Sequence, residues 1–180
     1  MKYTFLVMLF VSQLTIAQKH FTKTGITTFI ASVDTFEPIE AKNESTTVIL
    51  NTETGAIAAL LFVKAFHFEI ALMEEHFNEN YMDSNKYPKA TFKGKLINFN
   101  HENLTSETKT LQLKGTLSIH GKEKQIETEA QLKKLNHKII FTSHLSVKPE
   151  EFDIKIPGIV REKIAKSINL NLDYELIEKK

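Results

Sequence analysis

The chain has 180 residues, of which 42% are apolar and 25% charged, and its 23 basic side chains nearly balance its 22 acidic ones. This composition is typical of one ordinary domain with enough sequence to bury a core. It excludes a disordered chain, a collagen-like repeat and a multi-span helical membrane protein. The single arginine, Arg161, and the balanced charge argue against a nucleic-acid partner, and the absence of cysteine excludes disulfides and thiolate chemistry.

Residues 1–17 have the pattern of a signal peptide. A positive residue precedes an apolar run over residues 5–11, and Thr15 and Ala17 place small residues at the positions that a signal peptidase reads. The run is far shorter than the roughly 20 residues that a helix needs to cross a bilayer. We therefore expect an exported, periplasmic protein with no transmembrane segment in the mature chain and a single domain over residues 18–180.

The residues that follow alternate with a period of two, which is the pattern of strands that bury one face. In the first such stretch one parity is shared by Phe21, Thr27, Phe29 and Ala31. Two β-rich runs over residues 46–63 are separated by a polar turn that contains a glycine, so this segment predicts a β-hairpin.

One segment has the period of a helix instead. Its apolar residues are spaced four, three, four and four positions apart and form one stripe: Phe66, Ile70, Met73, Phe77 and Tyr81. This predicted helix cannot continue far, because turn residues and a proline follow it. A second, shorter helical turn is expected over residues 159–166.

The second half of the chain returns to alternation, most clearly over residues 111–119. A turn at Gly121 and a later polar turn lead into runs over residues 124–133 and 138–147, and a closing run covers residues 168–176. Short polar turns between evenly spaced strands predict an all-β domain with one packed helix, arranged as a meander-type sandwich or barrel.

The sequence nominates no catalytic group. It contains no His-Glu-x-x-His, no Gly-x-Ser-x-Gly and no glycine-rich phosphate loop, and its seven histidines form no ligand pair. Adjacent acids such as Glu74 and Glu75 point in different directions on a helix or a strand, so they form no shared acid–base site. We therefore expect no enzyme activity, no metal site and no cofactor.

Apolar area on the inward faces of the strands is the remaining signal. Two rows that we predict to point inward each hold one small residue among bulky ones, Ala59 in the first and Gly115 in the second. Small inward residues suggest space kept for an apolar guest inside a barrel. The alternative is ordinary core packing, in which a phenylalanine such as Phe77 or Phe92 fills each gap.

Three motifs together resemble a known family. A helix that carries a histidine is followed by Tyr-Pro-Lys-Ala-Thr-Phe over residues 87–92. The second motif is Gly-Thr-Leu-Ser-Ile-His-Gly over residues 115–121, and the third is Phe-Asp-Ile-Lys-Ile-Pro-Gly-Ile-Val over residues 152–160. In this order, and over about residues 20–177, the chain resembles the YceI-like family of periplasmic polyisoprenoid-binding proteins.

The resemblance implies an extended antiparallel β-barrel of lipocalin type with a helix packed against it. It also implies an apolar interior around a long isoprenoid tail, often in a homodimer, with no catalytic residue to carry over. The candidate ligand-binding residues of such a lining are Phe29, Ile57, Ala59, Leu61, Phe68, Ile70, Met73, Phe77, Phe92, Leu113, Leu117, Ile119, Phe141, Leu145, Leu170 and Leu172.

Two functions remain open at this point. The first is a non-enzymatic periplasmic carrier of an isoprenoid quinone, a polyprenyl lipid or a similar amphiphile. The second is a structural or interaction protein of the cell envelope, with a fully packed barrel and no small-molecule ligand. Leu60 and Phe62 motivate the second, because a strand that is apolar on both faces is either covered by a helix or in contact with a partner.

Overall fold

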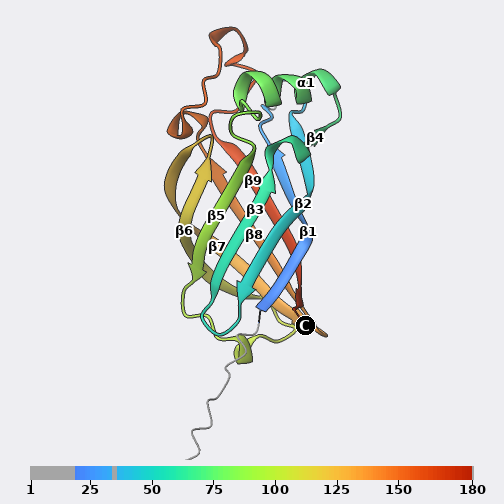
Figure 1. Cartoon of the computed structure of the whole chain (residues 1–180), viewed down its shortest axis with the longest axis vertical. Coiled ribbons are helices and arrows are strands. Elements are labelled where there is room, and N and C mark those ends of the chain that lie inside the picture. The colour runs from blue at the N-terminus through green and yellow to red at the C-terminus, as the bar shows by residue number, and fades with distance from the viewer. Residues whose placement is uncertain (1–18, 34–35, 180) are drawn as a thin grey trace, which may run out of the picture.

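The computed structural model describes residues 19–33 and 36–179, so the predicted signal peptide lies outside the described residues. The strands are β1 (Lys19–Ile30), β2 (Glu40–Asn51), β3 (Ala56–Phe62), β4 (His67–Phe68), β5 (Lys89–Leu96), β6 (Lys109–Ile119), β7 (Lys122–Leu135), β8 (Lys138–Val147) and β9 (Ile168–Glu178). Within the described residues all of these except β4 form a closed antiparallel barrel in the order β1, β9, β8, β7, β6, β5, β3, β2 (Figure 1). The ring closes because β2 also pairs with β1. The predicted all-β barrel with one packed helix is confirmed.

Tight turns join the neighbouring strands, and two of them depend on glycine. Gly55 between β2 and β3 has a φ of +73°, and Gly121 between β6 and β7 has a φ of +74°, a region that side-chain-bearing residues rarely adopt. The hairpin predicted over residues 46–63 is confirmed, with Leu50 paired to Ile57. The strands predicted after residue 110 are present as β6 to β9.

The parity predicted for the first strand is wrong at Phe21. The pairing of β1 with β2 shifts register on both sides of Gly25, which marks a β-bulge. Because the bulge adds a residue, Phe21 pairs with exposed Ile49 and Ile177 and points outside the barrel. A Cβ atom at Gly25 would lie 2.6 Å from Cδ1 of Tyr174, so the bulge and its glycine make room for that buried ring.

The predicted helix begins later than its apolar stripe suggests. The segment contains a 3₁₀ turn η1 (Val63–Ala65), strand β4, the helix α1 (Ala71–His76) and a π-helical turn η2 (Phe77–Tyr81). The prediction is wrong at its start because β4 pairs with β2 and holds residues 66–68 extended. The shorter turn expected over residues 159–166 is a 3₁₀ turn, η5 (Gly158–Val160). No helix in the described residues is long and apolar enough to cross a bilayer.

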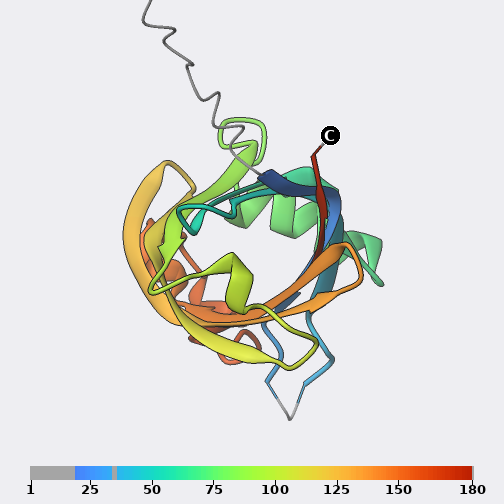
Figure 2. The same cartoon turned by 90° about the horizontal axis from the view of Figure 1, so that it is seen from below.

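Two clusters of buried side chains lie at opposite ends of the barrel. At the end away from α1, a short turn η3 (His101–Asn103) lies across the opening and Leu104 is buried beneath it (Figure 2). We call this cluster the closed-end core; its members are Val48, Leu50, Ile57, Leu96, Leu104, Leu111, Leu113, Ala130, Leu132, Ile139, Phe141, Tyr174 and Leu176. The other cluster, the helix-end core, lies under α1 and η2 and contains Phe66, Phe77 and Phe152.

Candidate functional site

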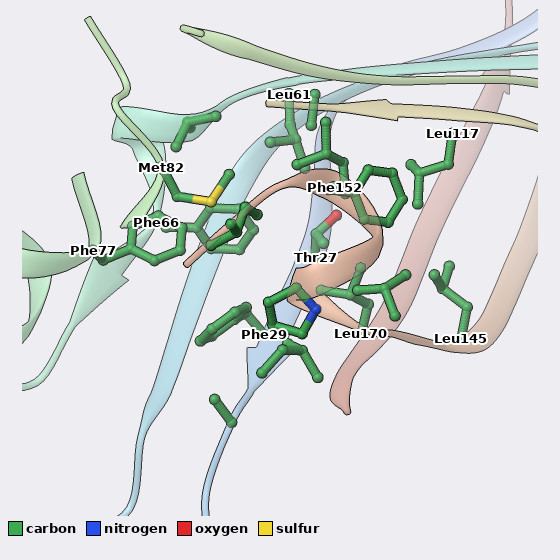
Figure 3. A pocket seen from close by; sticks show the side chains of 18 of the residues that line it. Thr27, Phe29, Leu61, Phe66, Phe77, Met82, Leu117, Leu145, Phe152 and Leu170 are labelled. Carbon is green, nitrogen blue, oxygen red and sulfur yellow. The ribbon is translucent and has the colours of Figure 1, made fainter. Parts of the chain in front are cut away.

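The helix end of the barrel encloses an apolar cavity of about 330 Å³. Strands form its sides, α1 and η2 lie along one edge, and the chain after β8 forms the other edge. Figure 3 shows apolar side chains from these elements converging on one space, among them Leu61, Leu117, Leu145 and Leu170. Most of the cavity lies in the helix-end half. Its lower end is lined by four members of the closed-end core, Ile57, Leu113, Phe141 and Tyr174.

Four phenylalanine rings form one wall of the cavity. The ring of Phe29 on β1 faces the rings of Phe66, Phe68 and Phe77 at centroid distances of 5.4 to 6.2 Å, all edge to face. Phe77 in turn lies 5.1 Å from Phe68 and 5.8 Å from Phe66. Aromatic pairs favour this geometry, and rings locked together in this way make a rigid apolar surface.

A small polar group marks the floor of the cavity. The Thr27 hydroxyl is hydrogen-bonded to the Thr46 hydroxyl at 2.9 Å and to the Tyr174 hydroxyl at 3.1 Å. Burial raises the pKa of Tyr174 to about 12 although the bond to Thr27 opposes that change. The Tyr174 ring stacks on Phe141 at 5.6 Å, which joins the floor to the closed-end core beneath it.

The cavity opens between the helical turns and the chain after β8. Among the lining residues that the structure describes, only His76 on α1 and Lys163 opposite it are exposed. We call residues 154–166 the rim segment. Its apolar side chains that line the cavity are Ile154, Ile156, Val160 and Ile164. The rim segment is tied to the barrel by the Ala165 N–H, which donates to the carbonyl of Ala31 at 2.9 Å.

Residues 11–176 match the YceI-like domain family. This chain belongs to the YceI-like family. No curated protein sequence matches it. A polyisoprenoid-binding domain from Saccharophagus degradans has the same fold, with a TM-score of 0.76 at 14% identity over 89% of this chain and 98% of that one.

Two other solved structures share the YceI-like barrel. BcnA from Burkholderia cenocepacia gives a TM-score of 0.69 at 14% identity over 86% of this chain and 96% of that one. The YceI protein of Campylobacter jejuni gives 0.65 at 18% identity over 81% of this chain and 88% of that one. At these identities the likeness shows the fold, and the family match is what assigns the chain.

The YceI-like barrel brings the predicted lining residues together with one exception. All of them line the cavity except Ile70, which immediately precedes α1. The sequence places Ile70 on the apolar stripe of one regular helix. In the structure Ile70 is extended and α1 starts only at Ala71, so Ile70 does not share the helix face that lines the cavity.

Sequence reasoning missed the floor and the rim of this YceI-like cavity. In the sequence, Thr27 is grouped only by its parity and Thr46 only as the start of a β-rich run. Nothing in the pattern predicts that either would contact Tyr174. The rim segment has no regular period, so parity could not orient its side chains. Phe152, which is buried in the lining, lies in the third family motif, and that motif was the available signal.

The two small inward residues have different surroundings. Ala59 lines the cavity and pairs with Phe92 on β5. At Gly115 an added Cβ would lie 2.6 Å from Cζ of Phe92, whose ring covers the Gly94–Gly115 pair. The packing alternative therefore holds at Gly115, where an aromatic ring fills the gap, whereas Ala59 borders the cavity.

Charged groups are sparse around the cavity. Among its described lining residues there is no aspartate or glutamate, and Lys163 and His76 are the basic side chains. No cluster of three or more histidine, aspartate or glutamate side chains in the described residues is placed to hold a metal ion. The lining therefore offers hydrophobic contact over most of its area, with basic groups confined to the opening.

A pair of histidines lies at the other end of the barrel. The rings of His20 on β1 and His101 in η3 are 5.5 Å apart, and the buried Nδ1 atom of each has no hydrogen-bond partner. Burial, together with the nearby charge of Lys134, lowers the pKa of both imidazoles, and Glu178 partly offsets this. These two histidines are not among the residues that line the cavity.

Proposed function

We propose that this YceI-like protein is a non-enzymatic carrier that binds an isoprenoid or another amphiphilic lipid inside its barrel, in the periplasm. The observation that supports this proposal is the cavity of about 330 Å³ with aromatic and aliphatic walls and one opening region. Its volume lies within the roughly 300–1,000 Å³ of small-molecule sites, at the lower end. Eight-stranded barrels are wide enough to hold one small ligand in this way.

The lipid is bound mainly by burial of its apolar tail. Each methylene transferred from water to the cavity stabilises the complex by about 0.8 kcal/mol. The tail lies against the phenylalanine wall and ends at the hydroxyl group of Tyr174 and its threonine partners. The head group stays at the opening, where Lys163 and His76 are the polar side chains within reach.

Similar proteins agree with a lipid guest. The Saccharophagus degradans domain that shares this fold is described as polyisoprenoid-binding. The resemblance seen in the sequence implies the same class of ligand, a polyprenyl lipid or an isoprenoid quinone. The cavity of this chain is closed below by the packed closed-end core, so only the helix-end half of the barrel is open to such a tail.

The alternative function requires a fully packed barrel, and dense packing is found mainly at the closed end. Most side chains of the closed-end core are buried away from the cavity, whereas the helix end surrounds the cavity. Phe62, which motivated a partner on the outer face, is 49% exposed, and the Lys89 ammonium lies 5.5 Å from its ring centroid. A lysine over an aromatic face is a common surface arrangement, so this side chain requires no partner protein.

Mass spectrometry of an organic extract of the purified protein tests the proposed function directly. We expect a stoichiometric lipid that is absent from the extract of an Ala59→Phe variant, because the added ring occupies the cavity. The stripped wild-type protein should then take up a fluorescent fatty acid, and the variant should not. A lipid-free extract together with no uptake of the probe would contradict the proposal.

A further inference from the structure

The rim segment carries the most exposed large apolar side chain in the described residues. Ile159 lies in η5 at the tip of the segment and is 90% exposed. The neighbouring Gly158 is open as well, since an added Cβ there would meet nothing within 4 Å. In Figure 1 this orange segment projects beyond the barrel at the same end as α1. At the tip of this projecting loop, the Ile159 side chain is free to contact an apolar surface.

The same segment also forms one side of the cavity opening. Ile156 and Val160 line the cavity, while Ile159 between them points away from it into solvent. One short stretch of chain therefore presents apolar side chains both to the cavity and to the surroundings. A lipid that enters or leaves the cavity must pass this rim, so a surface docked at Ile159 is continuous with the cavity opening.

The charges on the two sides of the opening differ in sign. The rim segment carries the bases Lys155, Arg161, Lys163 and Lys166 and a single acid, Glu162. Across the opening, residues 69–80 carry four glutamates and no lysine or arginine. Asp153, just before the rim segment, is paired with Lys122 at 2.7 Å. The basic charge is therefore concentrated around Ile159.

An exposed isoleucine in a segment with four bases and one acid is complementary to the surface of an anionic bilayer. Phosphate groups attract lysine and arginine, and the acyl region just below them accepts an apolar side chain. We propose that the rim segment docks the protein on a bilayer that contains anionic phospholipid, with Ile159 inserted and the four bases at the level of the phosphates. The use of this docking, to pass a lipid between the bilayer and the cavity, rests on the proposed function.

Sedimentation of the full chain with lipid vesicles tests the docking. Wild type should bind vesicles of phosphatidylcholine with phosphatidylglycerol, bind pure phosphatidylcholine vesicles more weakly, and lose the difference in high salt. Ile159→Asp should weaken binding by about tenfold or more, because an isoleucine no longer inserts. The matched control is Leu135→Asp, which places the same charge at a 40% exposed leucine at the closed end and should bind like wild type.

A charge-reversal pair tests the contribution of the bases. Lys155→Glu with Lys166→Glu should abolish the preference for anionic vesicles. Lys93→Glu with Lys95→Glu makes the same change of net charge on exposed positions of β5 and should preserve the preference. Equal loss in both pairs would mean that only net charge matters and would overturn docking through the rim.

A tail-binding assay separates this proposal from the proposed function. Ile159→Asp should bind a fluorescent fatty acid like wild type, because Ile159 lies outside the cavity lining. Unchanged vesicle binding by Ile159→Asp overturns the docking and leaves the carrier function standing. Vesicle binding that depends on Ile159 in a protein that takes up no probe supports the docking and contradicts the carrier function. A wild type that binds no vesicles overturns the docking.

Discussion

The two ends of the barrel are built from the same strands but are filled in different ways. At the closed end Leu96, Leu132 and Leu176 have no exposed surface, and η3 covers the opening. At the helix end the same ring of strands surrounds a cavity, and its lining includes partly exposed side chains such as Leu145 and Leu170. Strand β9, for example, contributes Leu176 to the closed-end core and Leu170 to the cavity lining.

The two ends of the barrel therefore contribute differently to the free energy of unfolding and to binding. Buried side chains in a filled core gain dispersion contacts on all sides, whereas those around a cavity lose the contacts that face the empty space. We infer that the closed end supplies most of the free energy of unfolding and that the helix end gives up part of it for a binding site. The boundary between the two is the layer formed by Tyr174 and Phe141.

The largest expected effect is a truncation in the closed-end core. Leu132→Ala should lower the free energy of unfolding by about 2–5 kcal/mol, because its side chain is completely buried among other core residues. Leu170→Ala, in the cavity lining, should cost less than half as much in the lipid-free protein, since one side of Leu170 has no partner atoms to lose. Urea unfolding of both variants measures the difference, and equal losses would show that the two ends are packed alike.

Substitutions that add a larger side chain should also destabilise the closed end more than the cavity lining. Ala130→Phe at the closed end should destabilise the protein by about 1–3 kcal/mol or more, because Ala130 has no exposed surface and packs among the buried side chains of the closed-end core. Ala59→Phe at the helix end should change the free energy of unfolding by less than about 1 kcal/mol, because the ring enters the cavity.

Lipid content is the second measurement on this pair. Ala59→Phe should carry no lipid at nearly wild-type stability. A strongly destabilised Ala59→Phe that still carries its lipid at full occupancy would show that no usable space exists at that position.

The boundary layer can be weakened by removing one hydroxyl. Tyr174→Phe should cost about 1 kcal/mol, the usual net value of a hydrogen bond, because the Tyr174 hydroxyl no longer satisfies Thr27. Burial raises the pKa of Tyr174 from 10.0 to about 12, so the unfolded chain loses this proton first as the pH rises. Wild-type stability should therefore be full below pH 10.0 and fall between there and about pH 12. Unfolding titrations should find this alkaline loss reduced in Tyr174→Phe, and an identical loss in both proteins would contradict the assignment.

The smallest expected effect is a loosening of the closed end in acid. The pKa values of His20 and His101 are lowered from 6.5, mainly by burial, so the unfolded chain takes up protons first as the pH falls. Stability should decrease progressively below about pH 6.5. His101→Gln should reduce this decrease, and the same substitution at exposed His137 serves as the control. Hydrogen-exchange protection factors of the η3 backbone, corrected for the intrinsic effect of pH on amide exchange, would measure it at two pH values. Protection factors that do not change with pH would contradict it.

The strands could be predicted from the sequence because their physical cause is local. Alternation over residues 111–119 and 168–176 follows from one buried face, and Gly55 and Gly121 mark turns that need positive φ. Strand alternation, together with the helical stripe that contains Met73 and Phe77, predicted nearly all the lining residues that the structure places around the cavity. The family resemblance supplied the closed barrel, which alternation alone left undecided between a sandwich and a barrel.

The features that escaped prediction depend on contacts between distant parts of the chain. The bulge at Gly25 reverses the parity of Phe21 because a ring from β9 requires the space. Phe66 leaves the helix because the residues after it pair with β2. The polar floor needs Thr27 and Tyr174 to meet across the barrel. None of these causes is visible within a window of neighbouring residues.

The pairing of β1 with β9 determines when the cavity comes into existence. Phe29 pairs with Leu170, so the ring cannot close until the last strand of the barrel has been added. Contacts so distant along the chain form slowly, because the intervening loop must be closed before they contribute. Leu170, Leu172 and Tyr174 all come from β9, so a chain without this strand has neither the floor nor one wall of the cavity. If the proposed function is correct, a lipid cannot act as a template for the early steps of folding and must be loaded after the barrel has closed.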